Sequence, residues 1–314
     1  MARYVARQFI SSMPVLLVVI VTVFLLIHLT PGDPAAVMLG SMATPDQVAV
    51  LRHDLGFDQP LIVQFLRWVG ELLHGNLGRS IYFHESVVHT LYEHAGPTMS
   101  LTLLALSIAL ILAIPSGICA AWFRGSLLDP AFMSASLLGT SIPNFWLALV
   151  LILLFAVKLG WLPVAGYSPL ADGAGPWFSH ILLPAFVLAV QQAGIIARML
   201  RDGMIEVLHQ PFIVTARSKG LAQRVVLGRH ALPNAAIPTA TVIGTSLTAL
   251  LGGAVVTETV FNIPGIGQLV VDSIARRDYP IVQGVVLFVA VVYVFVNIGV
   301  DVVYAAIDPR IRYA

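Results

Sequence analysis

Long apolar runs constrain this chain more than any other feature of its sequence. A helix needs about twenty consecutive apolar residues to cross a hydrocarbon core of about 30 Å, and runs of that kind recur along the 314 residues. The composition agrees, because 58% of residues are hydrophobic and 11% are charged. We therefore predict an all-α integral membrane protein with six transmembrane helices. The spans are expected near 9–29, 99–122, 132–157, 181–200, 236–258 and 281–305.

Basic residues predict the orientation of these spans, because cytoplasmic loops carry the excess of Lys and Arg. Eleven of the 17 basic residues fall on the N-terminal side of the predicted membrane. Six spans return the chain to that side, so both termini are expected to be cytoplasmic. A net charge of +1 gives no reason to expect nucleic acid as a partner. The eleven residues are Arg3, Arg7, Arg124, Arg198, Arg201, Arg217, Lys219, Arg224, Arg229, Arg310 and Arg312.

Three regions follow from this topology. Residues 1–29 form an N-terminal segment with the first span, 30–97 an extracytoplasmic loop, and 98–310 a five-helix core. Within the loop, Pro60 to Gly75 carries apolar residues at helical spacing, which predicts an amphipathic helix on the membrane surface or over the spans. The loop is either a simple cap or a receiver for a delivery protein, and its sequence does not separate the two.

A basic segment, VTARSKGLAQRVVLGRHALP at 214–233, separates the fourth and fifth spans within a cytoplasmic loop at 201–233. Pro211 is expected to divide two short helical pieces, 203–210 and 212–219, and Gly220 to end the second. Ala216 and Ser218 are small, so the surface of another protein could come close. The alternative is a solvated positive loop, which explains the charge but not the placement of Ala, Gly and Pro.

The segment resembles the EAA-x3-G-x9-I-x-LP signature of binding-protein-dependent ABC importer permeases, in the form found in the dipeptide, oligopeptide and nickel branch. Ala216, Gly220, Leu232 and Pro233 match in register, whereas Val214, Thr215 and His230 differ from the general signature. The resemblance covers nearly the whole chain. It continues at RYVARQF, HLTPGDP, LGFDQP, GNLGRS, SIPNFWLAL and TVFNIPGIGQLVVDSIARRDYP.

This resemblance implies a type I ABC importer permease fold in a bacterial inner membrane. It implies as partners a second homologous permease, two ABC ATPase subunits and an extracytoplasmic solute-binding protein, beside membrane lipid. ATP and Mg would be bound by the ATPases, since the sequence lacks G-x-x-x-x-G-K-[ST], and this chain would be a transport subunit without cofactors. Residues 212–222 would form the coupling helix that an ATPase moves. Its contacts are expected at Thr215, Ala216, Arg217, Ser218, Lys219, Gly220 and Leu221.

Polar residues within spans indicate where a solute could pass, because unpaired polar groups at membrane depth face a cavity or a neighbouring helix. The same residues could instead make hydrogen bonds between packed helices. At the far end of the fifth span, Pro264, Gly265 and Gly267 would break a helix, and they predict an external gate or a plain loop. The candidates for the pathway are Asn144, Gln191, Gln192, Thr245, Thr248 and Glu258.

Other functions are weaker on these residues. An ion-coupled secondary transporter is the main alternative, but the two repeated halves typical of that class are not evident. His84, His89 and His94 are spaced by five, which places them on different faces of a helix and predicts no metal site. Dipeptides or short oligopeptides are the expected cargo, with glutathione, nickel chelates and opines as alternatives.

Overall fold

In this computed structural model, residues 2–29, 34–39, 44–54 and 56–307 are described. All regular secondary structure in these ranges is helical, beside one isolated β-bridge between Arg79 and Ser86. Five described helices are long and apolar enough to cross a membrane, or six if one bent pair counts as a single span. The all-α membrane fold is thereby confirmed, while residues 30–33 of the HLTPGDP motif lie outside the described residues.

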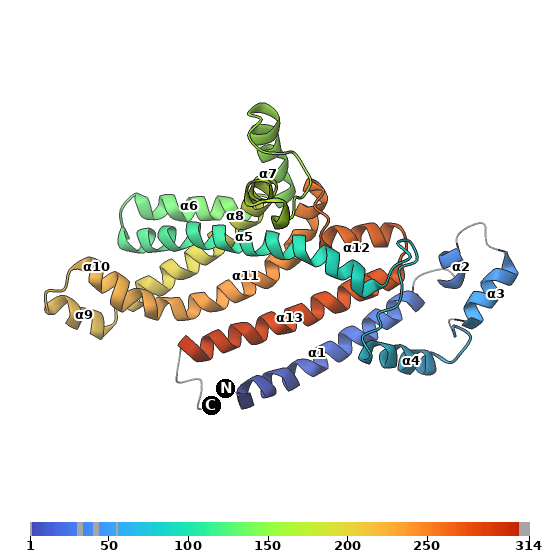
Figure 1. Cartoon of the computed structure of the whole chain (residues 1–314). Coiled ribbons are helices and arrows are strands. Elements are labelled where there is room, and N and C mark those ends of the chain that lie inside the picture. Colours follow the sequence, from blue (N-terminus) through green and yellow to red (C-terminus); the bar gives the residue numbers. More distant parts are fainter. Residues whose placement is uncertain (1, 30–33, 40–43, 55, 308–314) are drawn as a thin grey trace.

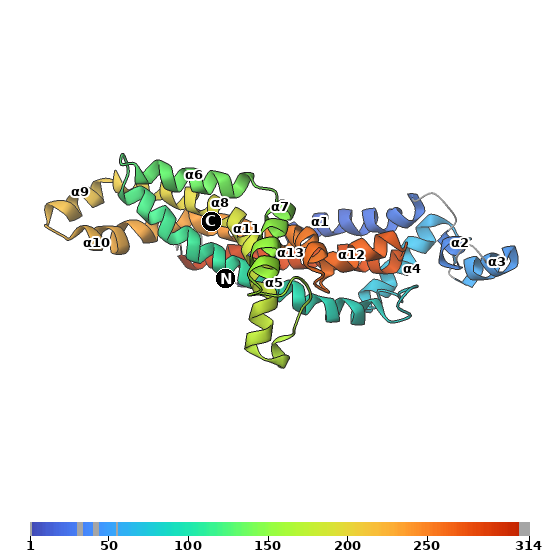
Figure 2. The ribbon, with the colours of Figure 1, turned by 90° about the horizontal axis from the view of Figure 1, so that it is seen from above.

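Five long helices run side by side along the molecule (Figure 1, Figure 2). Each one extends beyond the span predicted for it. Local caps set their ends: the Ser86 hydroxyl accepts from the His89 backbone N–H at the start of α5, and Asn262 ends α11 in the left-handed conformation. The helices are α1 (Ala2–Leu29), α5 (Val87–Trp122), α8 (Ala174–Leu208), α11 (Leu232–Phe261) and α13 (Tyr279–Ile307).

The third span is broken. α6 (Leu128–Ser141) is followed by α7 (Asn144–Leu151) and the π-helical turn η1 (Ile152–Lys158), which bend away by 99°. The break falls at Ile142, because a residue before proline avoids the α conformation. α7 leaves the bundle as an arm (Figure 1). The single continuous helix expected near 132–157 is therefore wrong, since 14 residues of α6 reach only about 21 Å.

Small residues let the helices approach closely. A methyl group added at Gly194 of α8 would lie 2.5 Å from the Ser136 carbonyl oxygen of α6, and one at Gly117 of α5 would lie 2.8 Å from the Ala197 carbonyl oxygen. Gly244 of α11 likewise faces Val300 of α13 within the same chain. Close backbone approach of this kind is typical of packed membrane helices. The core between α5, α8 and α11 includes Leu101, Ile181, Leu188 and Leu250.

Two ends of the bundle differ. The first residues of α1 and the last of α13 lie at the end that carries α9 (Pro211–Ser218), which we call the α9 end (Figure 1). The opposite end, the α4 end, carries the helices of the predicted loop. α4 is amphipathic as predicted and leaves Ile62 and Leu66 each 63% exposed. These elements are α2 (Pro34–Leu39), α3 (Pro45–Asp54) and α4 (Leu61–Leu73) at the α4 end, and α10 (Gln223–Val225) and η3 (Val226–Ala231) near α9.

Candidate coupling surface, pathway and gate

The short helix α9 begins and ends where the sequence predicts. Pro211 occupies its first turn, where a missing N–H breaks no helical hydrogen bond. Gly220 follows its last turn with φ +76°, a conformation that residues with a side chain rarely adopt. The separate piece expected at 203–210 is wrong, because α8 continues to Leu208 without a break.

One face of α9 packs within the chain. Ile213 is fully buried and Ala216 is 7% exposed, and both belong to a core cluster with Val226 and Leu227 of η3. The small side chain of Ala216 therefore packs against residues of the same chain. We had expected it to allow the close approach of a partner protein, and the structure uses it for this internal contact. This packing fixes how α9 stands on the rest of the bundle.

The opposite face of α9 points outward. Phe212 is 44% exposed and Val214 is 57% exposed, beside the exposed basic residues Arg217 and Lys219. Large apolar side chains that stay exposed next to positive charge are typical of a surface that docks another protein. A merely solvated loop would not need them. We call this the α9 surface: Phe212, Val214, Thr215, Arg217, Ser218, Lys219 and Leu221.

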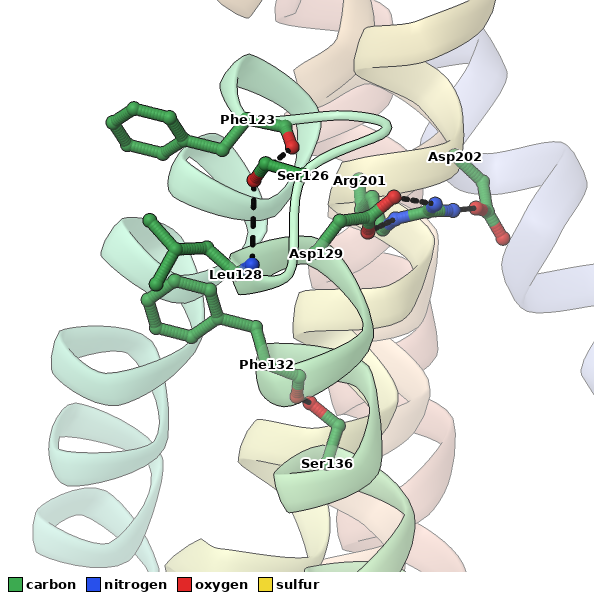
Figure 3. A network of polar contacts seen from close by, with 8 residues as sticks. All are labelled: Phe123, Ser126, Leu128, Asp129, Phe132, Ser136, Arg201 and Asp202. Carbon is green, nitrogen blue, oxygen red and sulfur yellow. Dashed lines mark hydrogen bonds and ion pairs between the residues drawn. The ribbon is translucent and has the colours of Figure 1, made fainter.

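An ion pair joins α6 to α8 near the α9 end (Figure 3). Arg201 donates from Nε and Nη2 to the two carboxylate oxygens of Asp129, each at 2.7 Å, and from Nη1 to Asp202 at 2.9 Å. The two-pronged geometry holds both side chains in one orientation. We counted Arg201 from the sequence only as a cytoplasmic charge, because its partner is 72 residues away.

Two of the predicted pathway residues meet. Asn144, at the first turn of α7, donates from Nδ2 to Gln191 Oε1 of α8 at 3.4 Å. The adjacent Gln192 is buried, with 7% of its surface exposed. By contrast, Thr245 and Thr248 donate to carbonyl groups of their own helix, α11. The structure thus gathers Asn144 and Gln191 at the base of the α7 arm and leaves the two threonines satisfied locally.

Glu258 is fully buried and accepts several hydrogen bonds. The Thr98 hydroxyl of α5 donates to Oε1 at 2.7 Å, and the backbone N–H groups of Gly267 and Gln268 donate to Oε2 at 2.7 and 3.1 Å. The same Thr98 hydroxyl accepts from the Ile266 N–H at 2.8 Å. We call these contacts the Glu258 knot. In this arrangement the carboxylate faces the protein interior and holds three helices together.

The glycines at the predicted gate make room for the knot. A helix, α12 (Ile266–Ala275), begins directly after Gly265 and contains Gly267, so our expectation that Gly267 breaks any helix is wrong. A methyl group at Gly265 would collide with the Glu258 carboxylate, and one at Gly267 would lie 2.5 Å from Val255 Cα. Pro264 is exposed in the short turn between α11 and α12. The carboxylate at the start of α12 also suits the positive end of a helix dipole.

Comparison with known proteins decides the family. Residues 113–313 match the family described as binding-protein-dependent transport system inner membrane component, and residues 1–102 match the N-terminal region described for such membrane components. The chain belongs to this family.

The permease is also similar to named relatives over its full length. It is 44% identical to a probable peptide ABC transporter permease protein, y4tP, of Sinorhizobium fredii, with 100% of both chains covered. It is 42% identical to the di/tripeptide transport system permease protein DppB of Pseudomonas aeruginosa, covering 100% of this chain and 99% of the relative. It is 40% identical to the glutathione transport system permease protein GsiC of Salmonella paratyphi A, again with both chains fully covered.

Among solved structures, the permease resembles a chain of the inward-facing MetNI methionine ABC transporter. The TM-score is 0.58 at 20% identity, and the match covers 70% of this chain and 96% of the other. At that identity the likeness concerns the fold alone. It agrees with the helical core seen here and with the type of fold that the resemblance implied.

A second carboxylate of the permease is buried as well. Asp278, before α13, is 1% exposed and accepts from the Ser80 hydroxyl and from the backbone N–H of Tyr82 at 3.2 Å. Arg276 lies over the Tyr82 ring, with 3.7 Å to its centroid. Asp278 and Arg276 thus both contact the loop that holds residues 80–82. Only the three-dimensional contact of 80–82 with 278 reveals this.

Three potential metal-binding side chains also converge on α5 and the residues before it. Atoms of Glu85, His89 and Glu93 lie within 4.8 Å of one another, and all three residues are exposed. Their spacing of four residues places them on one face of the chain, unlike the three histidines spaced by five. Exposed groups of this kind are common without a metal, so the cluster carries no functional conclusion.

Proposed function

We propose that this permease forms half of the translocation pathway of an ATP-driven importer of dipeptides and short oligopeptides. The peptide-transport names of relatives at 42% and 44% identity support the substrate class. The α9 surface supports the coupling to an ATPase, and it is the observation that carries the proposal. Exposed apolar and basic side chains on a helix at one end of the bundle form a surface to which a protein partner could bind.

In this proposal the α9 end is cytoplasmic and α9 lies in a groove of an ATPase subunit. Two such ATPases bind ATP and Mg, and a second homologous permease completes the pathway. When the ATPases close on nucleotide they bind one arrangement of the permease pair better than the other, and this difference in affinity shifts the equilibrium between outward-open and inward-open states. A binding protein delivers the peptide from the opposite side.

The pathway and gate residues take separate roles. Asn144 follows the break in the third span and Gln191 meets it from α8, so their side-chain amides can hydrogen-bond the backbone of a peptide there. The Glu258 knot and the 264–267 turn hold α12 at the α4 end, which the proposal places outside. Support for a gate there comes from the breaks before and after α12.

Glutathione is a second candidate cargo, because the relative named for glutathione transport is 40% identical over the full chain. Glutathione is itself a short peptide, so a similar pathway could carry both. Uptake of a labelled dipeptide, competed by unlabelled dipeptide or by glutathione, separates the two. Stronger competition by glutathione would reassign the cargo.

The proposal is tested by purifying the tagged permease with the products of its neighbouring genes and measuring ATP-dependent uptake in proteoliposomes. We expect two ATPases and a second permease to copurify, and uptake to need ATP and to resist uncouplers. Uptake that collapses with an uncoupler and needs no ATPase would instead favour an ion-coupled transporter.

A further inference from the structure

A partly open cavity of about 350 Å³ lies at the α4 end, bordered by α1, α4, the turn at 56–59 and the start of α13. It differs from a second cavity of about 670 Å³, whose lining, mainly from α5, α11 and α13, is almost entirely apolar. That larger cavity could hold any hydrocarbon chain and would select none. The cavity at the α4 end combines charged, amide and aromatic side chains, so it can discriminate between ligands.

Two opposite charges border this cavity one helical turn apart. Arg67 and Glu71 both line it from α4, and residues four apart lie on the same face of a helix. Even so, they form no ion pair with each other among the described residues. Glu71 accepts a hydrogen bond from Asn76 Nδ2 at 2.7 Å, whereas Arg67 has no hydrogen-bond partner among the described residues. Each charge thus remains available to a ligand.

The turn at 56–59 accommodates the guanidinium. Gly56 has φ +71°, and a methyl group added to it would lie 3.2 Å from Arg67 Nη1. The absence of a side chain at this position therefore leaves Arg67 room beside the turn. An arginine with free N–H groups at the border of a cavity is suited to a phosphate or a carboxylate, which it can bind with two parallel hydrogen bonds.

Aromatic rings form the inner wall. Phe24 of α1 contacts Trp68 of α4 with 5.8 Å between ring centroids, and His28 contacts Phe57 at 6.3 Å. Gln64 fixes the His28 ring through its Oε1, 3.0 Å from Nε2. Aromatic faces attract cations. An ammonium group could therefore sit between Trp68 and the Glu71 carboxylate while an anionic group meets Arg67.

The position of the cavity indicates where such a ligand comes from. α4 turns Gln64, Arg67 and Glu71 toward the cavity and leaves Ile62 and Leu66 exposed on another face. An amphipathic helix with exposed apolar residues lies in the interface of a bilayer, with its apolar face in the acyl region. The cavity then stands at the depth of lipid headgroups, beside the last turns of the membrane-spanning α1.

From these contacts we infer that the cavity binds the zwitterionic headgroup of a phospholipid with a primary amine, with its phosphate at Arg67 and its ammonium at Glu71 and Trp68. Phosphatidylethanolamine has this chemistry. Phosphatidylcholine has no N–H group that could donate a hydrogen bond to Glu71. Phosphatidylglycerol has no ammonium group. Only the choice of leaflet rests on the proposed function, because the headgroup would bind at this end of the bundle whichever cargo is carried.

The test is native mass spectrometry of the full-length permease, delipidated in detergent and titrated with phosphatidylethanolamine, phosphatidylcholine or phosphatidylglycerol of identical acyl chains. We expect wild-type protein to prefer phosphatidylethanolamine. Arg67→Gln and Glu71→Gln should each weaken that binding by roughly tenfold to a hundredfold, as loss of a charge-assisted hydrogen bond predicts. Arg52→Gln, in neighbouring α3 and outside the cavity lining, is the matched control and should bind normally.

The comparison of lipids on wild-type protein needs no variant, so misfolding of a variant cannot obscure it. Equal binding of all three lipids, or tighter binding of phosphatidylglycerol, would overturn the inference. A final arm adds dialanine, a soluble zwitterion. Failure of dialanine to displace the lipid supports a lipid site, whereas displacement at low excess would make a soluble peptide the ligand. This experiment measures lipid binding, so a negative result would leave the importer proposal intact. Likewise, a failure to observe uptake would leave the lipid-site proposal intact.

Discussion

The α9 surface and the Glu258 knot differ in the exposure of their side chains. On α9, apolar side chains such as Val214 remain 57% exposed and the neighbouring Arg217 is exposed too. In the knot, a carboxylate is fully buried and both of its oxygens accept hydrogen bonds from the same chain. The first region leaves its apolar and charged groups exposed at the surface of the chain, and we proposed a partner protein for it. The second region is satisfied within this chain. Mutations should therefore affect binding in the first region and stability in the second.

The largest loss of stability is expected from Glu258→Ala. It leaves the N–H groups of Gly267 and Gln268 without their acceptor, and each buried donor left unsatisfied costs about 1–3 kcal/mol. Thermal unfolding of the purified permease, followed by tryptophan fluorescence, measures the loss. The control is Asp272→Ala, which removes an exposed carboxylate from α12. Equal unfolding temperatures for the two variants would refute the structural role of the knot.

A smaller loss is expected from Gly267→Ala, because its methyl group would lie 2.5 Å from Val255 Cα and force α11 and α12 apart. Overpacking of this kind costs about 1–3 kcal/mol. Gly252→Ala is the matched control in α11, since no atom lies within 4 Å of its added methyl. The same unfolding assay should show a shift only for Gly267→Ala. A shift of equal size at Gly252 would mean that α12 is not packed as described.

The ion pair between Asp129 and Arg201 should contribute less to the free energy of unfolding than the packing at Gly267. Its side chains are 11% and 21% exposed, so water screens the pair only in part. A double-mutant cycle of Asp129→Asn and Arg201→Gln should give a coupling free energy of about 1–2 kcal/mol. The cycle of Asp202→Asn with Arg201→Gln should give less, since the Asp202 side chain is 68% exposed. Coupling that is larger for Asp202 than for Asp129 would contradict the geometry in Figure 3.

The smallest change in stability, within about 0.5 kcal/mol, is expected from Val214→Asp, because exposed substitutions away from packed sites rarely do more. Uptake should nevertheless be lost, since a charge would enter the proposed contact with an ATPase. Val50→Asp in α3, 61% exposed at the other end of the molecule, should preserve uptake. If Val214→Asp transports normally, α9 does not couple the permease to an ATPase.

Local patterns predicted the elements that local physics controls. The apolar runs predicted the long helices, and the spacing of apolar residues predicted α4. Pro211 predicted the start of α9, and Gly220 predicted its end. Contacts between distant residues could not be predicted in this way. Thr98 meets Glu258 across 160 residues, and nothing near either one signals the other.

The bend at 142–143 shows an intermediate case. Pro143 stood in the sequence within the predicted third span, but a proline can kink a membrane helix or end it, and the run 132–157 around it contains no charged residue that would mark a break. α6 packs on α8 through Gly194 and α7 then contacts α8 and α11, so the direction of α7 depends on helices that lie far away in the sequence. Ala216 is a similar case, because the sequence alone does not distinguish a small residue that contacts a partner protein from one that packs within the chain.

Site-specific photocrosslinking at position 214 tests the coupling role of the α9 surface most directly. A photoreactive amino acid replaces Val214, with the same substitution at Val50 as the control, in the assembled complex in membranes. The account predicts a crosslink from position 214 to an ATPase subunit, with a yield that changes when nucleotide is added, and none from position 50. An actively transporting complex that crosslinks from position 214 only to lipid would contradict it.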